Sequence, residues 1–427
     1  MIRIRCFQKR QISHNMRISP KYVVKFNCIS SLSGDGEKQM IRKPVLLIPG
    51  IGGSILVKPG EERMQIFGHK LLHNRWLNIY PMSRQMMDMW KEDMNIPLLR
   101  NDAGNVIGYD LKYNQLKPYD VGGIRGVCNV VPEFELLPKM YQDIFQEHFS
   151  HEYFSPICKE LESGGHTVHR DLFGFPYDFR LLLDPIVREE TMMLLKSIID
   201  IAYATNSERR VVIVTHSLGG LLLHWFLTCF VDAAWANKYI DSIVGLNVPF
   251  GGSSAALKTT LYGEYYLPFL RHMFMDGLQT NSGVIMCLPN LMSYKRDDVL
   301  IQDNTGRTIT IDQYDDSNEP GLQIWKELYQ PWQKALGMKS LVKYYGLLSC
   351  GSGTGVSYHT KHLKMYPDRT IKTEDGDGYV SQSSMEVYKV LYPSHVNIKV
   401  HGVGHSQILA DKRITNFVAK LARGQMM

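Results

Sequence analysis

The feature that most constrains the fold is a sudden change of pattern within residues 211–220, VVIVTHSLGG. Residues 211–214 are apolar and β-branched, which is typical of a buried central strand. From residue 221 onward, LLLHWFLTCF places apolar residues at helical spacing. The chain must therefore pass from strand to helix within about three residues, and Ser217 stands in that turn.

A serine in this position is the predicted nucleophile. A sharp strand-to-helix turn holds its hydroxyl clear of the sheet, and Gly219 and Gly220 leave room for the backbone to fold tightly. The first N–H groups of the helix point at the turn, where they stabilise negative charge on an attacked acyl carbonyl. This pattern is that of the nucleophile elbow of an α/β-hydrolase, although Thr215 stands where a small residue is usual. The alternative is a serine in an ordinary strand-to-helix loop.

The rest of the chain also predicts an α/β-hydrolase fold, with a mainly parallel central sheet covered by helices. Further strand candidates lie at 43–57, 240–253, 342–353 and 396–405. A lid at about residues 60–100, rich in Met and Trp, and a cap at about residues 254–340, helical and aromatic in pattern, interrupt the alternation. We therefore expect one catalytic domain over residues 41–427.

Basic residues are concentrated at the start of the chain. The first 34 residues carry seven Lys and Arg and no Asp or Glu, which accounts for the formal net charge of +6. The nearly neutral remainder argues against a nucleic-acid partner. We expect residues 1–40 to form a basic arm, either a targeting or membrane-surface segment or a disordered leader. A secretory signal peptide is not expected, because the arm has no continuous apolar stretch.

The seven cysteines are scattered and include no CxxC pair. This distribution suggests neither a zinc site nor a disulfide framework, so we expect no metal, no cofactor and a reducing, intracellular location. No apolar run reaches the roughly 18 residues that a transmembrane helix needs, and contact with membranes is therefore expected to be peripheral.

A nucleophilic serine needs a base and a carboxylate, which in this fold follow it along the chain at the carboxyl ends of strands. His405 in HGVGH, where a strand ends in a glycine-rich turn before a helical pattern, is the predicted base, and His401 is the alternative. The turn TEDGDGYV offers Asp375 and Asp377, either of which can accept several backbone N–H bonds and stay ionised. The residue pattern alone leaves both candidates open.

The oxyanion hole requires two backbone N–H donors. One is expected from Leu218, which follows the nucleophile. The other is expected from Ile51 in PGIGGS, the loop after the first strand, because its glycines allow the loop to approach the substrate carbonyl closely.

The motifs and their order resemble those of the lecithin:cholesterol acyltransferase family, which includes lysosomal phospholipase A2 of group XV, plant phospholipases and phospholipid:diacylglycerol acyltransferase. The resemblance extends from around Lys43 to the C-terminus. It rests on VLLIPGIGGSIL, RWLNIY with Trp90 beyond it, DLFGFPYDFR, VTHSLGG, LNVPFGGS, and DGDGYV followed by HGVGH.

This resemblance implies a triad of Ser217, Asp377 and His405, with Ile51 and Leu218 as the oxyanion donors. Two features of the chain depart from the family pattern. Tyr379 stands where members usually have Thr, so the acid turn is expected to pack differently. Secreted and lysosomal members carry a disulfide in the lid, whereas this chain has no cysteine between residues 28 and 128, which counts against an extracellular or lysosomal location.

Two segments, 76–94 and 262–275, are rich in Met, Trp and Tyr. Met is adaptable, and Trp and Tyr favour membrane interfaces, so we expect a lid that opens onto lipid. The residues predicted to face the lipid are Trp76, Met86, Met87 and Trp90. The alternative is that these side chains pack in the core of a cap.

The sequence therefore predicts a lipid-active serine hydrolase or O-acyltransferase of the phospholipase A type. Ser217 would take an acyl chain from a glycerophospholipid and pass it to water or to a lipid alcohol. One alternative is an acyltransferase that acts mainly on diacylglycerol or a sterol, and another is a binding protein without catalysis. The oligomeric state and the choice between hydrolysis and transfer stay open.

Overall fold

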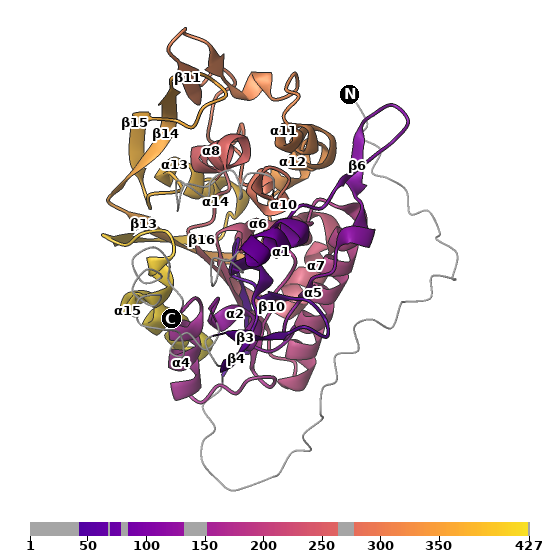
Figure 1. The fold of residues 1–427 in the computed structure, drawn as a ribbon. Coiled ribbons are helices and arrows are strands. Elements are labelled where there is room, and N and C mark those ends of the chain that lie inside the picture. Colours follow the sequence, from indigo (N-terminus) through magenta and orange to yellow (C-terminus); the bar gives the residue numbers. More distant parts are fainter. Residues whose placement is uncertain (1–41, 67–68, 78–83, 132–151, 264–276, 426–427) are drawn as a thin grey trace, which may run out of the picture. The chain divides into compact units, whose positions relative to one another are not determined.

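The computed structural model describes residues 42–66, 69–77, 84–131, 152–263 and 277–425. Its centre is a parallel sheet of six strands in the order β16-β13-β10-β9-β1-β8 (Figure 1). The strands are β1 (Val45–Ile48), β8 (Leu172–Gly174), β9 (Val211–His216), β10 (Ile240–Leu246), β13 (Lys343–Cys350) and β16 (His395–His401). The predicted α/β-hydrolase fold with a mainly parallel sheet is confirmed.

Helices cover both faces of this sheet, which explains why its inner strands β1, β9, β10 and β13 are buried along nearly their whole length. On one face, Val45, Val212 and Val244 share a buried cluster with Ile157 and Val418. The helices on that face are α4 (Ser155–Ser163) and α15 (Lys412–Ala422), while α5 (Pro185–Thr205), α6 (Leu218–Trp225) and α7 (Ala233–Tyr239) lie on the other (Figure 1). Aspartate side chains cap three of them: Asp184 for α5, Asp232 for α7 and Asp411 for α15.

A second, smaller sheet, in the order β12-β11-β14-β15, was not predicted. Its strands are β11 (Ile301–Asp303), β12 (Thr308–Ile309), β14 (Ser352–Thr360) and β15 (Arg369–Gly376). Two of them lie within the segment 254–340, for which only helical and irregular structure was expected. Here β11 pairs with β14, a strand far away in the sequence, and such a pairing leaves little trace in a short local pattern.

The helices of the segment between β10 and β13 pack beside this sheet (Figure 1). They are α8 (Ser254–Tyr262), α10 (Ser282–Met286), α11 (Pro320–Ile324) and α12 (Gln330–Leu336), with η6 (Ile311–Gln313) and the π-helical turn η7 (Trp325–Tyr329). After β15 follow α13 (Gln382–Met385) and α14 (Tyr388–Leu391), and η8 (Gln407–Ala410) precedes α15. A π-helical turn, η4 (Phe226–Phe230), ends α6.

Residues 61–96, which we call the lid segment, contain a hairpin of β3 (Arg63–Ile66) and β4 (His69–Leu72), then η1 (Arg75–Leu77) and α1 (Arg84–Met94). Arg75 Nε donates to Asp93 Oδ2 at 2.6 Å, and both side chains are buried. A guanidinium N–H of Arg180 also donates to the carbonyl of Asp93. The first contact lies within the lid segment, and the second joins its described part to the rest of the domain.

The strands that follow are short hairpins: β5 (Leu98–Arg100) with β6 (Val106–Tyr109), and β2 (Leu56–Val57) with β7 (Lys117–Pro118). Between them lies η2 (Leu111–Tyr113), and α2 (Arg125–Cys128) follows. The sulfur atoms of Cys128 and Cys158 lie 3.0 Å apart in the core, a pairing that the spacing of the cysteines did not suggest.

None of the helices in the described ranges is long and apolar enough to cross a membrane. The basic arm predicted for residues 1–40 lies outside those ranges, so its targeting or membrane role stays a prediction.

Candidate active site

Ser217 occupies the turn between β9 and α6 with φ 53° and ψ −127°, a conformation that costs an L-residue about 1–3 kcal/mol. Tight packing holds the turn in this shape. A Cβ atom on Gly219 would lie 2.5 Å from the carbonyl oxygens of Ile48 and Pro49, at the end of β1. Thr215, where a smaller residue is usual, is fully buried, and its hydroxyl has no hydrogen-bond partner among the described residues.

His405 lies in the loop after β16 and reaches both predicted partners. Its Nε2 atom is 3.0 Å from Ser217 Oγ, and its Nδ1 atom is 2.6 Å from Asp377 Oδ2. With one proton on Nδ1, donated to the carboxylate, Nε2 is free to accept the proton of the serine hydroxyl. The side chain of Asp377 is fully buried, while that of His405 is 15% exposed, so the imidazole remains accessible to a substrate.

Asp377 is held by the backbone of its own turn. Its Oδ1 atom accepts from the N–H groups of Tyr379 at 2.9 Å and Val380 at 2.7 Å, which leaves Oδ2 for His405. Three donors on one buried carboxylate fix its orientation.

The two alternatives that the residue pattern left open lie elsewhere. Asp375 is exposed at the end of β15, where its Oδ1 atom accepts from the N–H groups of Gly351 at 2.6 Å and Gly376 at 2.8 Å. His401 is exposed at the end of β16, with Nδ1 3.3 Å from the sulfur of Cys350. The structure therefore brings Asp377 and His405, not Asp375 and His401, to Ser217.

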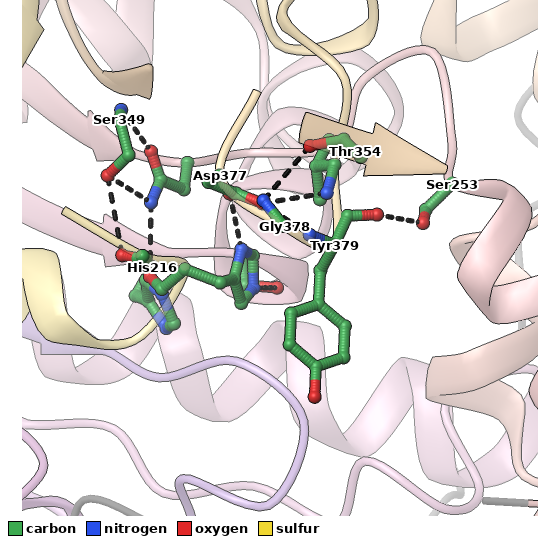
Figure 2. A network of polar contacts seen from close by, with 12 residues as sticks. His216, Ser253, Ser349, Thr354, Asp377, Gly378 and Tyr379 are labelled. Atoms are coloured by element: carbon green, nitrogen blue, oxygen red, sulfur yellow. Dashed lines mark hydrogen bonds and ion pairs between the residues drawn. The ribbon is translucent and has the colours of Figure 1, made fainter. Parts of the chain in front are cut away.

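Two residues that sequence reasoning missed fix the acid turn (Figure 2). Thr354 Oγ1 accepts from the N–H of Gly378 at 2.9 Å, and the hydroxyl of Ser253 donates to the carbonyl of Tyr379. Ser253 belongs to the motif LNVPFGGS, which was noticed for its pattern but given no role. Tyr379 is 44% exposed, and the centroid of its ring lies 5.8 Å from that of the His405 imidazole. The tyrosine that replaces the usual Thr of the family therefore lies beside the site.

The predicted oxyanion donors also lie beside the serine. The loop after β1 makes a tight turn over residues 50–53, in which the N–H of Gly53 donates to the carbonyl of Gly50 at 3.1 Å. A Cβ atom on Gly50 would lie 2.8 Å from the Cβ of Ser217. Neither the N–H of Ile51 nor that of Leu218 has a hydrogen-bond partner in the part of the chain that the structure describes. Both are therefore free to bind an oxyanion.

Two buried tyrosines anchor this turn, and neither was singled out from the sequence. The hydroxyl of Tyr177 donates to the carbonyl of Pro49 at 2.7 Å, and the hydroxyl of Tyr153 accepts from the N–H of Gly50 at 2.9 Å. Burial raises the pKa of both hydroxyls, so they stay protonated. Tyr177 lies in the quoted motif DLFGFPYDFR, whereas Tyr153 stands in no motif.

The four predicted lipid-facing residues have three different outcomes in the structure. Trp90 is only 2% exposed and its Nε1 donates to the carbonyl of Trp76 at 2.9 Å, so in this structure it packs in the core, the alternative that the sequence left open. Trp76 is partly exposed and its ring packs edge-on against Phe179. The side chains of Met86 and Met87 lie outside the described residues.

Over the described ranges, no group of three or more His, Cys, Asp and Glu side chains gathers in a way that could hold a metal ion.

Comparison with known proteins identifies the relatives of this chain. Residues 143–351 match the family model described as lecithin:cholesterol acyltransferase. The chain is 25% identical over 356 residues to the lysosomal phospholipase A and acyltransferase of Rattus norvegicus, a match that covers 80% of each protein. It is 27% identical over 227 residues to the lecithin-cholesterol acyltransferase-like 4 protein of Arabidopsis thaliana, covering 51% of this chain and only 36% of that relative.

Among solved structures, a chain in the crystal structure of the Tle4–Tli4 complex resembles this one with a TM-score of 0.50. The match covers 90% of this chain and 98% of that chain at 11% sequence identity. At such low identity, the likeness concerns the fold alone.

Proposed function

The chain belongs to the lecithin:cholesterol acyltransferase family, and on that premise we propose that it is a lipid-active serine hydrolase or O-acyltransferase of the phospholipase A type. The observation that carries the proposal is the pair of hydrogen bonds that joins Ser217 to His405 and His405 to Asp377. The free N–H groups of Ile51 and Leu218 beside the serine support it further.

In the first half-reaction, Ser217 Oγ attacks an ester carbonyl of a glycerophospholipid while His405 Nε2 takes the hydroxyl proton. The N–H groups of Ile51 and Leu218 stabilise the negative charge on the former carbonyl oxygen. As the tetrahedral intermediate collapses, His405 returns the proton to the departing lysophospholipid alcohol, and the acyl group stays on the serine. Asp377 accepts the hydrogen bond from His405 Nδ1 throughout and stabilises the imidazolium.

In the second half-reaction, His405 takes a proton from the acceptor as it attacks the acyl-serine. The acyl–oxygen bond to the serine then breaks, and His405 returns the proton to Ser217 Oγ. Water as the acceptor gives a free fatty acid, and a lipid alcohol gives a new ester. Both outcomes use the same residues, so one site serves hydrolysis and transfer alike. The substrate resides in bilayers, and we therefore propose that the protein works at a membrane surface, with the partly exposed Trp76 near the turn that carries Ile51.

The proposal is tested with vesicles of phosphatidylcholine labelled in both acyl chains, with and without an added long-chain alcohol. Wild-type protein should release labelled fatty acid, and labelled ester when the alcohol is present. Ser217→Ala should release neither while it keeps the wild-type melting temperature, because the turn tolerates a small residue. Folded wild-type protein that releases no acyl chain, or equal release by both proteins, would contradict the proposal.

A further inference from the structure

The backbone carbonyl of His405 receives two side-chain hydrogen bonds. Nε2 of His216 and Nδ2 of Asn247 each lie 3.0 Å from it, and both side chains are buried. The loop around His405 is rich in glycine, and Gly402 adopts a φ of +74°. His216 at the end of β9 (Figure 2) and Asn247 just after β10 therefore hold the base in a loop that has little stiffness of its own.

The second ring nitrogen of His216 is connected to the oxyanion turn. Its Nδ1 atom is hydrogen bonded to the hydroxyl of Tyr153, which in turn accepts from the N–H of Gly50 at 2.9 Å. The period of two along β9 explains this orientation, because it puts His216 on the same face as Val212 and Val214. These valines share a buried cluster with Tyr153.

The proton positions in this chain of contacts are determined by the groups at its ends. A carbonyl can only accept, so Nε2 of His216 must carry the proton that goes to His405. Nδ1 then accepts from the Tyr153 hydroxyl, whose oxygen accepts from the N–H of Gly50. Burial is the main cause that lowers the pKa of His216 to about 3, so the imidazole stays neutral and keeps this single tautomer at neutral pH.

We propose that His216 and Tyr153 are positioning residues that connect the oxyanion turn at residues 50–53 to the loop of the base. Through them, the donor of the oxyanion hole and the imidazole of His405 keep one relative geometry during both half-reactions. The inference rests on the proposed function, since this geometry affects a rate only if Ser217 is the nucleophile. A displacement of about 1 Å between such groups can cost orders of magnitude in rate.

The carbonyl of His405 would have a hydrogen-bond donor even without His216. Asn247 already donates to the carbonyl of His405, and its other side-chain hydrogen bonds join it to Ser349 rather than to the oxyanion turn. The specific contribution of His216 is the second contact, to Tyr153 and through it to Gly50. The test must therefore break that contact and leave the carbonyl of His405 with a donor.

Two substitutions meet this requirement. Tyr153→Phe removes the hydroxyl and keeps the ring, and His216→Gln removes Nδ1 but keeps an amide that can donate to His405. The matched control is Tyr388→Phe, because the buried hydroxyl of Tyr388 has no hydrogen-bond partner among the described residues. The rate of phosphonylation by a soluble fluorophosphonate and the kcat and KM for a short water-soluble ester are measured for the singles and the double, with melting temperatures alongside.

Each single variant should react about tenfold more slowly, with KM changed less than about twofold. The double variant should be no slower than the worse single, because both substitutions break the same contact. Tyr388→Phe should keep the wild-type rates. Wild-type rates in either single, or losses that multiply in the double, would overturn the inference. A folded wild-type protein that does not react at all would contradict the proposed function, and the inference with it.

Discussion

The carboxyl edge of the central sheet and the lid segment hold their polar groups in different ways. At the edge, Asp377 and the carbonyl of His405 receive hydrogen bonds from neutral backbone and side-chain donors. In the lid segment, a buried ion pair joins Arg75 to Asp93 at 2.6 Å. When a neutral donor is removed by substitution, no charged partner of that donor is left unpaired. When one member of a buried ion pair is removed, the other is left as an uncompensated buried charge. We therefore expect changes at the edge to alter rates, and changes in the lid segment to alter stability.

The largest effect is expected at the acid of the edge. Asp377→Asn should lower kcat for a soluble ester by about 10⁴-fold, because the amide favours the wrong tautomer of His405. Asp375→Asn should cost far less, since that carboxylate contacts Gly351 and Gly376 rather than the imidazole. Steady-state kinetics on both variants provides the measurement. The reverse ranking would show that the acid is Asp375.

In the lid segment, Trp90→Ala should lower the free energy of unfolding by about 3–5 kcal/mol, since it empties the space of a large buried side chain. Activity on vesicles and on a soluble ester should then fall together as the protein unfolds. The measurements are the free energy of unfolding in urea and the activities on vesicles and on the soluble ester, all at one temperature. A selective loss on vesicles at unchanged stability would instead support the predicted lipid-facing role of Trp90.

The buried ion pair of the lid segment can be compared with an ion pair that is more accessible to water. Arg75→Met should lower the free energy of unfolding by about 3 kcal/mol, because the carboxylate of Asp93 is left buried without its cation. The control is Lys112→Met, which removes a pair between the exposed Lys112 and the partly exposed Asp110 and should cost much less, because water screens such a pair. Equal costs in urea unfolding would mean that burial of the pair has no energetic consequence.

The last prediction about stability concerns pH and two buried histidines. Burial lowers the pKa of His216 to about 3 and that of His224 to about 4. Below about pH 6.5 the unfolded chain binds protons that the folded chain does not, so stability is full above that pH and falls as the pH drops toward 4. His216→Gln should show a weaker fall than wild type when urea unfolding is compared at neutral and acidic pH. An identical pH dependence would exclude a contribution from His216.

The elbow and the central sheet could be predicted because their signals are local. The apolar run before Ser217 and the helical pattern after it specify the strand, the turn and the helix within a short stretch, and the structure places Gly219 where a side chain would collide with Ile48 and Pro49. The short strand β8 and the second sheet were missed. Their pairing partners lie far apart along the chain, and three residues are too few to show a period.

The choice between Asp375 and Asp377 shows where reasoning from residues alone reached its limit. Both aspartates lie in one glycine-spaced turn. They differ in the distant group that each one contacts: Asp375 accepts from the N–H of Gly351, and Asp377 is hydrogen bonded to His405. The same holds for Tyr153, a single residue outside any motif whose hydroxyl meets His216 only after folding. Local spacing predicts the type of site, and long-range contacts decide which residues complete it.

The central claim is that Ser217 is the nucleophile of an acyl transfer, and covalent labelling tests it most directly. Folded protein is treated with a fluorophosphonate probe, digested, and the modified residue is located by mass spectrometry. The account predicts one adduct, on Ser217, which disappears in Ser217→Ala at an unchanged melting temperature. Labelling that persists in the variant, on another serine, would contradict it.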